Sequence, residues 1–117
     1  MIFALGSEFA GVFTNSHDLF KQLKKAGHRV NEKVWEMPCT EYHKKLISPK
    51  HCDLTNSSGK TEAGASQAAA FLKCFVEEGV NWAHIDIAGS SMGASESTGW
   101  GSRILVEYIH SLSNPKQ

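Results

Sequence analysis

The stretch EAGASQAAAFLKCFVEEGVNWAHIDIAG, residues 62–89, decides the fold of this chain. Its first part predicts a helix over residues 62–79, because it is rich in alanine, the best helix former, and is apolar on nearly every side. Gly79 lies at its end, where a left-handed helix cap favours glycine. The period of the pattern then changes from 3.6 to 2, which predicts a strand over residues 82–87. A helix with so little polar surface must be covered by other structure, so this stretch belongs in the middle of a domain.

A loop of small residues, Ala88 to Gly93, follows the predicted strand. In open α/β sheets, ligands bind outside the carboxyl ends of the strands, which makes this loop a candidate functional site. Asp86 lies just before the loop, and a buried carboxylate between isoleucines has to be hydrogen-bonded or ion-paired. We interpret Asp86 as a structural anchor or as a support for a nearby site. His84 is interpreted as a core histidine.

The composition is that of an ordinary globular protein. The chain has 117 residues, of which 41% are hydrophobic and 21% are charged, and its twelve basic and twelve acidic side chains balance. This balance gives no indication of a nucleic-acid or membrane-surface partner. The longest apolar run is far shorter than the roughly 20 residues of a membrane span, and no secretory signal is expected. Three cysteines without short pair spacings favour reduced thiols and a cytoplasmic setting.

The first half of the chain predicts short elements. The apolar run Met1 to Leu5 indicates a strand, and residues 6–14 indicate irregular extended chain. Asn15 or Ser16 can cap a helix that ends at Gly27 and that has three lysines facing water. Residues 29–38 give no clear element, although their apolar side chains should be buried anchors.

The second half adds two more helices. A short helix is expected over residues 39–46 with Tyr42 and Leu46 directed inward, and a turn-rich loop should follow over residues 48–60. The last helix should start at Ser102 as its N-cap. Its expected core stripe consists of Ile104, Leu105, Tyr108, Ile109 and Leu112. About four helices and two or three strands predict an α/β fold, yet so few strands cannot cover these helices. Residues 1–113 are therefore expected to be part of a larger α/β domain, with residues 114–117 as a flexible tail.

Two patterns could carry chemistry on their own. The sequence Gly89-Ser90-Ser91-Met92-Gly93 fits the G-x-S-x-G motif of serine hydrolases, with Ser91 as nucleophile. However, such an elbow requires a helix directly after the serine, and residues 93–101 are rich in glycine and serine. We therefore interpret this segment as a flexible loop.

The second pattern is a set of possible zinc ligands. The side chains of Cys39, His43, His51 and Cys52 are of the types that bind zinc in tetrahedral sites. Their spacing matches no zinc module, and the adjacency of the last two makes simultaneous coordination awkward. A chance cluster is the simpler interpretation.

Several segments together resemble the leucyl aminopeptidase family, also called cytosol aminopeptidases. These segments are LGSEFAGVFTN (5–15), VWEMP (34–38), the D-x-x-N of residues 53–56, AAAFLKCFV (68–76) and WAHIDIAG (82–89). The resemblance covers residues 1–112. It implies a cytosolic metallo-aminopeptidase with a three-layer αβα catalytic domain, which acts on peptides with apolar N-terminal residues and assembles as a hexamer. This chain resembles the C-terminal part of that domain.

The resemblance also indicates which functional residues are present. The family binds two divalent ions, zinc or manganese, through a lysine and several carboxylates in motifs upstream of this segment, so no metal ligand and no catalytic residue is expected here. Ala88 is similar to a residue that lines the substrate pocket, and Ser91 takes the place of an apolar pocket residue. The alternative is a truncated, non-enzymatic module that binds full-length subunits through exposed core surface.

Overall fold

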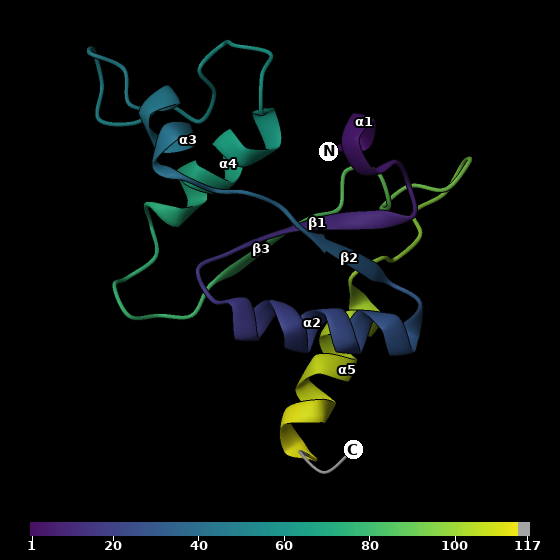
Figure 1. Cartoon of the computed structure of the whole chain (residues 1–117). Coiled ribbons are helices and arrows are strands. Elements are labelled where there is room, and N and C mark those ends of the chain that lie inside the picture. Colours follow the sequence, from purple (N-terminus) through teal and green to yellow (C-terminus); the bar gives the residue numbers. More distant parts are fainter. Residues whose placement is uncertain (115–117) are drawn as a thin grey trace.

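Three strands form the sheet at the centre of the molecule. In a computed structural model that describes residues 1–114, they lie in the order β2–β1–β3 (Figure 1). The central strand β1 (Phe9–Thr14) runs parallel to β2 (Lys33–Glu36) and antiparallel to β3 (Ala83–Asp86). With five helices in the described range, the fold is of the expected α/β class.

The helices lie on both sides of this sheet. Figure 1 shows α2 (His17–Val30) and α5 (Ser102–Ser113) on one side. On the other side lie α1 (Ile2–Leu5), α3 (Glu41–Leu46) and α4 (Gly64–Lys73). The arrangement has the layering of an αβα domain with a narrow sheet.

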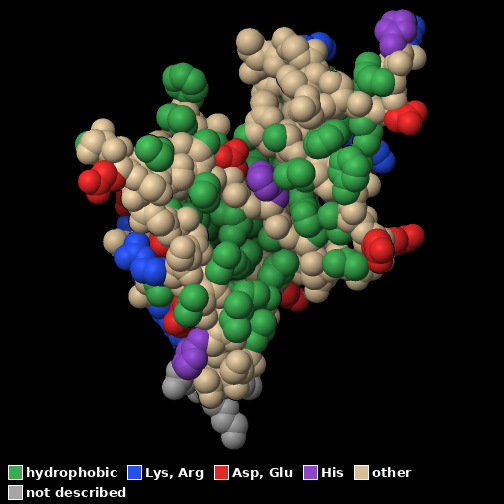
Figure 2. Space-filling view, turned by 180° about the vertical axis from the view of Figure 1, so that it is seen from behind, with side chains coloured by type: hydrophobic (Ala, Val, Ile, Leu, Met, Phe, Trp, Pro, Cys, Tyr) green, Lys and Arg blue, Asp and Glu red, His purple; other side chains and the backbone are tan. Residues whose placement is uncertain are grey.

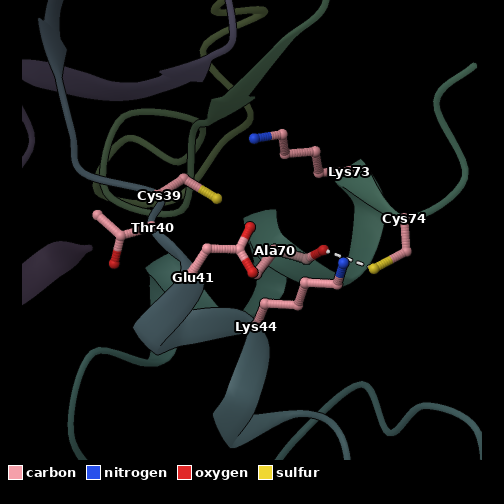
Figure 3. A pocket seen from close by; sticks show the side chains of 7 residues that line it. All are labelled: Cys39, Thr40, Glu41, Lys44, Ala70, Lys73 and Cys74. Carbon is pink, nitrogen blue, oxygen red and sulfur yellow. Dashed lines mark hydrogen bonds between the residues drawn. The ribbon is translucent and has the colours of Figure 1, made fainter. Parts of the chain in front are cut away.

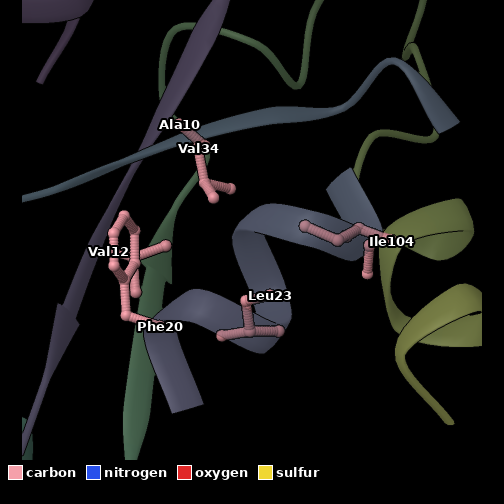
Figure 4. Close-up of a cluster of buried hydrophobic side chains, with 7 residues drawn as sticks. Ala10, Val12, Phe20, Leu23, Val34 and Ile104 are labelled. Atoms are coloured by element: carbon pink, nitrogen blue, oxygen red, sulfur yellow. The ribbon is translucent and has the colours of Figure 1, made fainter. Parts of the chain in front are cut away.

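The main hydrophobic core lies between the sheet and α2. Figure 4 shows its side chains approaching one another from β1, β2, α2 and α5. The buried members are Ala10, Val12, Phe20, Leu23, Ala26, Val34 and Ile104. Because Ala10, Val12 and Val34 alternate with residues that face the other way, the period of 2 places one face of the sheet against the apolar stripe of α2.

The helix α2 begins as its sequence predicts and ends later. The Ser16 side chain accepts a hydrogen bond from the Leu19 N–H, which confirms an N-cap at that position. The expected end at Gly27 is wrong, because the helix continues to Val30 and Asn31 forms the left-handed cap with φ 57°. Gly27 is instead a packing residue. A Cβ there would lie 2.2 Å from the Glu32 carbonyl oxygen.

Two expectations at the N-terminus are also wrong. Residues Ile2–Leu5 form one helical turn instead of a strand, and the segment expected to be irregular contains β1, the central strand. A short apolar run does not distinguish a strand from a helical turn. The alternation of Phe9, Gly11 and Phe13 with Ala10 and Val12 was the better strand pattern, and Lys33–Glu36 of the unassigned segment pairs with it.

The middle helices are shorter than expected. In α3, Tyr42 is exposed and Leu46 is half-buried, whereas His43 and Ile47 are buried. The helix α4 ends at Lys73, so Gly79 lies in a later turn with φ 82° and does not cap it. The apolar surface of α4 is incompletely covered, because Leu72 is 40% exposed and Phe75, just beyond the helix, is 70% exposed.

The last helix differs in its cap and in its buried face. Gly101 takes the N-cap position that was expected for Ser102. Of the expected core stripe, Ile104 is fully buried and Tyr108 is half-buried, while three members are exposed: Leu105, Ile109 and Leu112. The start of α5 is held by Glu32, whose buried carboxylate accepts hydrogen bonds from the Ile104 N–H at 2.8 Å and from Arg103 Nε at 3.1 Å.

The described range ends one residue after α5. The tail expected over residues 114–117 therefore lies outside the described residues, except for Asn114. None of the helices in the described range is long and apolar enough to span a membrane.

Candidate functional site

The carboxyl end of β3 carries the residues that the sequence proposes for the site. Asp86 is the last residue of the strand and pairs with Gly11 of β1. Its Oδ1 accepts a hydrogen bond from the Ala88 N–H at 3.0 Å, which turns the chain away from the sheet. Asp86 is half-buried and not buried as expected, and this local hydrogen bond sets the start of the candidate loop.

The loop after β3 is held by backbone contacts. The N–H groups of Ser90 and Ser91 both donate to the Ile87 carbonyl, and the Thr98 N–H donates to the Ser91 carbonyl at 2.9 Å. Gly89 packs so closely against the N-terminal turn that a Cβ would lie 2.1 Å from the Gly6 carbonyl oxygen. The loop therefore has a defined shape over residues 87–91.

The two proposed pocket residues, Ala88 and Ser91, lie three positions apart in this loop. Ala88 is exposed and Ser91 is half-buried, and Met92 beside it is 61% exposed. Ser90 between them is buried, and its Oγ has no hydrogen-bond partner among the described residues. Ala88 and Ser91 thus present small side chains at the end of β3, a surface that can form one wall of a site.

His84 faces the same side of the sheet as Asp86. Its ring stacks on Phe13, with 5.9 Å between the ring centroids and an interplanar angle of 27°. Burial lowers the pKa of His84, and the nearby Asp86 carboxylate opposes that change. The neutral ring is therefore favoured, although His84 is half-buried and does not lie in the fully buried core expected of it.

The segment after Ser91 does not have the geometry of a serine-hydrolase elbow. An isolated β-bridge joins Met92 and Ser97, and the next helix starts only at Ser102. A triad would also need an acid after Ser91 in the chain; Glu107 is one such residue, and it pairs with Arg29 at 3.0 Å. These features support the interpretation of the segment as a loop.

The possible zinc ligands are not brought together. His43 Nδ1 lies 3.0 Å from the Thr40 N–H as part of a capping box at the start of α3, while His51 and Cys52 lie in an exposed loop. In the part of the chain that the structure describes, no group of three or more His, Cys, Asp or Glu side chains is arranged to hold a metal ion. The described residues therefore do not fit the two metal ions that the family resemblance implies.

A small cavity lies between α3 and α4 (Figure 3). Its volume is about 120 Å³, and it is lined by Cys39, Thr40, Glu41, Lys44, Ala70, Lys73 and Cys74. Burial raises the pKa of the Cys39 thiol, while Lys73 acts in the opposite direction. Cys74 donates its thiol hydrogen to the Ala70 carbonyl at 3.3 Å, and all three cysteines of the chain are free.

Nothing in the sequence predicts this cavity. Lys44 and Lys73 belong to different helices, which the intervening loop brings together. No spacing or motif in the sequence indicates that these two lysines lie close together, because their proximity depends on how α3 and α4 pack.

Comparison with known proteins identifies the family. Residues 1–106 match the model of the cytosol aminopeptidase family, catalytic domain. The chain is 41% identical over 117 residues to a probable cytosol aminopeptidase of Rickettsia bellii, with 93% of the chain and 23% of the relative covered. It is 46% identical over 120 residues to that of Phytoplasma mali, with 97% and 24% covered. The chain thus spans about a quarter of the length of these relatives.

Solved structures agree with this result. The bottromycin maturation enzyme BotP superposes with a TM-score of 0.90 at 29% identity, over 96% of this chain and 26% of that enzyme. The same enzyme in complex with Mn superposes with a TM-score of 0.87 at 30% identity, over the same shares of both chains. Because the family model covers most of the chain and the fold agrees as well, this chain belongs to the cytosol aminopeptidase family and matches a part of that family's catalytic domain.

Proposed function

We propose that residues 1–113 form the C-terminal part of the catalytic domain of a metal-dependent aminopeptidase, which releases N-terminal, preferably apolar residues from peptides. The observation that carries this proposal is the match of residues 1–106 to the catalytic-domain model of the family. The two divalent ions, zinc or manganese, would be held by residues outside this chain. By the family resemblance, their ligands come from motifs upstream of the segment that this chain matches.

In this proposal the chain contributes one wall of the substrate pocket. Ala88 and Ser91 lie at the carboxyl end of β3, where α/β proteins place their ligands. The Ala88 methyl group gives an apolar contact for a substrate side chain, and the small Ser91 side chain leaves room beside it. The hydrogen bond from the Ala88 N–H to Asp86 keeps this wall in position.

The second contribution is packing. Both outer strands of the sheet, β2 and β3, have a free edge within the described residues. Apolar side chains gather in a broad band on the molecular surface (Figure 2), which indicates contact with further structure. The rest of a catalytic domain would cover this band. From the resemblance to the leucyl aminopeptidase family, we also propose that the intact protein is a cytoplasmic homo-hexamer.

A chimera tests the pocket role directly. Residues 1–113 would replace the matching segment of the Rickettsia bellii relative. We expect the chimera to hydrolyse leucine p-nitroanilide in the presence of Mn²⁺, and the 117-residue chain alone to show no activity with or without metal. Metal-dependent activity of the isolated chain that persists through repeated purification would contradict the proposal that the metal ligands lie outside this chain.

A matched pair of variants tests whether Ala88 lines the substrate pocket. In the active chimera, Ala88→Leu should lower kcat/KM for leucine p-nitroanilide by about tenfold, since an extra isopropyl group occupies the pocket. Ala94→Leu, in the exposed part of the same loop, is the control and should stay within twofold. Equal effects of the two variants would count against a pocket role for Ala88.

The second candidate function is a non-enzymatic module that binds full-length subunits. The exposed apolar side chains favour it, for example Phe75 at 70% and Ile109 at 62% exposure. Co-elution of the isolated chain with an intact family subunit in gel filtration, together with an inactive chimera, would support this alternative. An active chimera and an isolated chain that elutes alone would exclude it.

A further inference from the structure

A basic and aromatic cavity lies at the outer edge of the sheet, between β2 and α2. It has a volume of about 130 Å³ and is lined by Phe9, Lys24, His28, Lys33, Val34 and Trp35, which we call the edge pocket. Lys33 and Trp35 are two residues apart on β2 and so share one face of the strand, and Phe9 is the β1 partner of Lys33. Lys24 and His28 are neighbours on α2, because residues four apart lie on the same helical face.

The rings and the cations of the edge pocket are in contact. Phe9 and Trp35 pack edge to face, with 6.2 Å between their ring centroids. Lys24 Nζ lies 5.6 Å from the Trp35 ring centroid, and Lys33 Nζ lies 5.7 Å from that of Phe9. Trp35 is 54% exposed, so a large part of its surface remains open to a ligand. Lys24 is exposed, as expected from the sequence, and its ammonium group lies over the Trp35 ring.

The charges around the pocket are unbalanced. Lys33 pairs with Glu8, but Lys24 and His28 have no carboxylate partner among residues 1–114. No acidic side chain lines the cavity. An ammonium group and an imidazole N–H are therefore available to one anionic group on a ligand.

The size of the cavity limits the rest of the ligand. An apolar cavity of about 150 Å³ accommodates benzene, so the edge pocket has room for about one aromatic ring. A ring packed on the exposed surface of Trp35, beside Phe9, would gain stacking contacts of the kind that aromatic pairs make. Amino acids are less suitable, because their own ammonium group would lie among the cations of the pocket.

From this geometry we propose that the edge pocket binds a small aromatic carboxylate, one ring with a directly attached or nearby carboxylate group. The ring packs on Trp35 and Phe9, and the carboxylate pairs with Lys24 and His28. This site consists of contacts within the chain and does not depend on the aminopeptidase assignment.

The test uses benzoate as the probe and the complete 117-residue chain. Titration of ¹⁵N-labelled protein, followed by NMR, should shift the indole N–H signal of Trp35 and leave those of Trp82 and Trp100 in place. The signal is assigned with Trp35→Phe. We expect benzyl alcohol, which lacks the charge, and acetate, which lacks the ring, to bind at least about fivefold more weakly than benzoate. Equal binding of the three probes would overturn the proposal.

Two lysine variants on the same helix make the test specific. Lys24→Gln should weaken benzoate binding by about fivefold or more, since it removes the ammonium group from the pocket. Lys21→Gln is the matched control, because Lys21 is exposed on α2 and pairs with Asp18. Far-UV circular dichroism confirms that both variants are folded. Equal effects of the two substitutions, or a shift of all three indole signals, would indicate nonspecific binding of benzoate to the surface. Either result would overturn the proposal.

Discussion

Helices α2 and α4 differ in how far the chain covers their apolar surfaces. In α2, Phe20, Leu23 and Ala26 are buried against the sheet, and the outer face carries lysines. In α4, small residues such as Ala69 and Ala70 are buried, while larger apolar side chains at its end remain exposed. A helix whose stripe is covered within the chain contributes to the stability of the chain. A helix with uncovered apolar surface indicates where further structure packs.

The largest expected effect contrasts leucines of the two helices. Leu23 is 3% exposed and Leu72 is 40% exposed. We expect Leu23→Ala to lower the free energy of unfolding by about 2–5 kcal/mol, because it leaves a cavity in the core. Leu72→Ala should change it by less than about 0.5 kcal/mol. Urea denaturation followed by circular dichroism measures both. Similar losses would mean that α4 is packed as tightly as α2.

Glycines provide a second contrast between the same helices. At Gly27 of α2 a Cβ would meet the Glu32 carbonyl oxygen, whereas at Gly64 of α4 it would meet nothing within 4 Å. Gly27→Ala should therefore destabilise the protein by about 1–3 kcal/mol through overpacking. Gly64→Ala should be neutral or stabilise by up to about 1 kcal/mol, because alanine favours helix. In thermal unfolding, Gly27→Ala should lower the Tm, whereas Gly64→Ala should leave it unchanged or raise it.

The start of α5 provides the next contrast, because Glu32 joins it to the α2 side of the molecule. Its carboxylate is fully buried and accepts the Ile104 N–H. Glu32→Ala removes this cap and should cost about 1–2 kcal/mol of unfolding free energy. Glu32→Gln keeps an acceptor oxygen and should cost less. A smaller loss for alanine than for glutamine in the same urea titration would contradict the capping role.

The smallest expected effect concerns how the free energy of unfolding depends on pH through His84 of β3. Burial lowers the pKa of His84 below its usual value of about 6.5. The unfolded chain then binds a proton more readily than the folded chain, so His84 reduces stability as pH falls from the usual pKa to the lowered one. Above the usual value it has no effect. His84→Gln should flatten this dependence between pH 7.5 and 5.5 in urea titrations. An unchanged slope would show that other groups cause it.

Several elements could be predicted from local sequence. The Ser16 cap, the strand at Ala83–Asp86 and the last helix follow from capping chemistry and periodicity, which depend on near neighbours. The strand β1 was missed and α1 was mistaken for a strand, because a short apolar segment takes its form from the structure that pairs with it.

The candidate site was predictable to a similar degree. The loop after β3 follows from strand periodicity, and Ala88 and Ser91 follow from the family resemblance; their role in binding remains a proposal. The edge pocket was not predictable. Lys24 and Trp35 meet through the packing of α2 on β2, and the lysines of α2 have the same appearance in the sequence as any solvated helical face.

The sequence by itself determined the α/β class, the family and the position of the strand that carries the candidate loop. Each of these depends on residue order over short distances, or on a pattern shared with relatives. Tertiary structure alone decided that β1 is the central strand, that Glu32 caps α5, and that the apolar surfaces of α4 and α5 exceed what the chain covers. These features arise between residues far apart in the sequence, where packing and burial outweigh local preference.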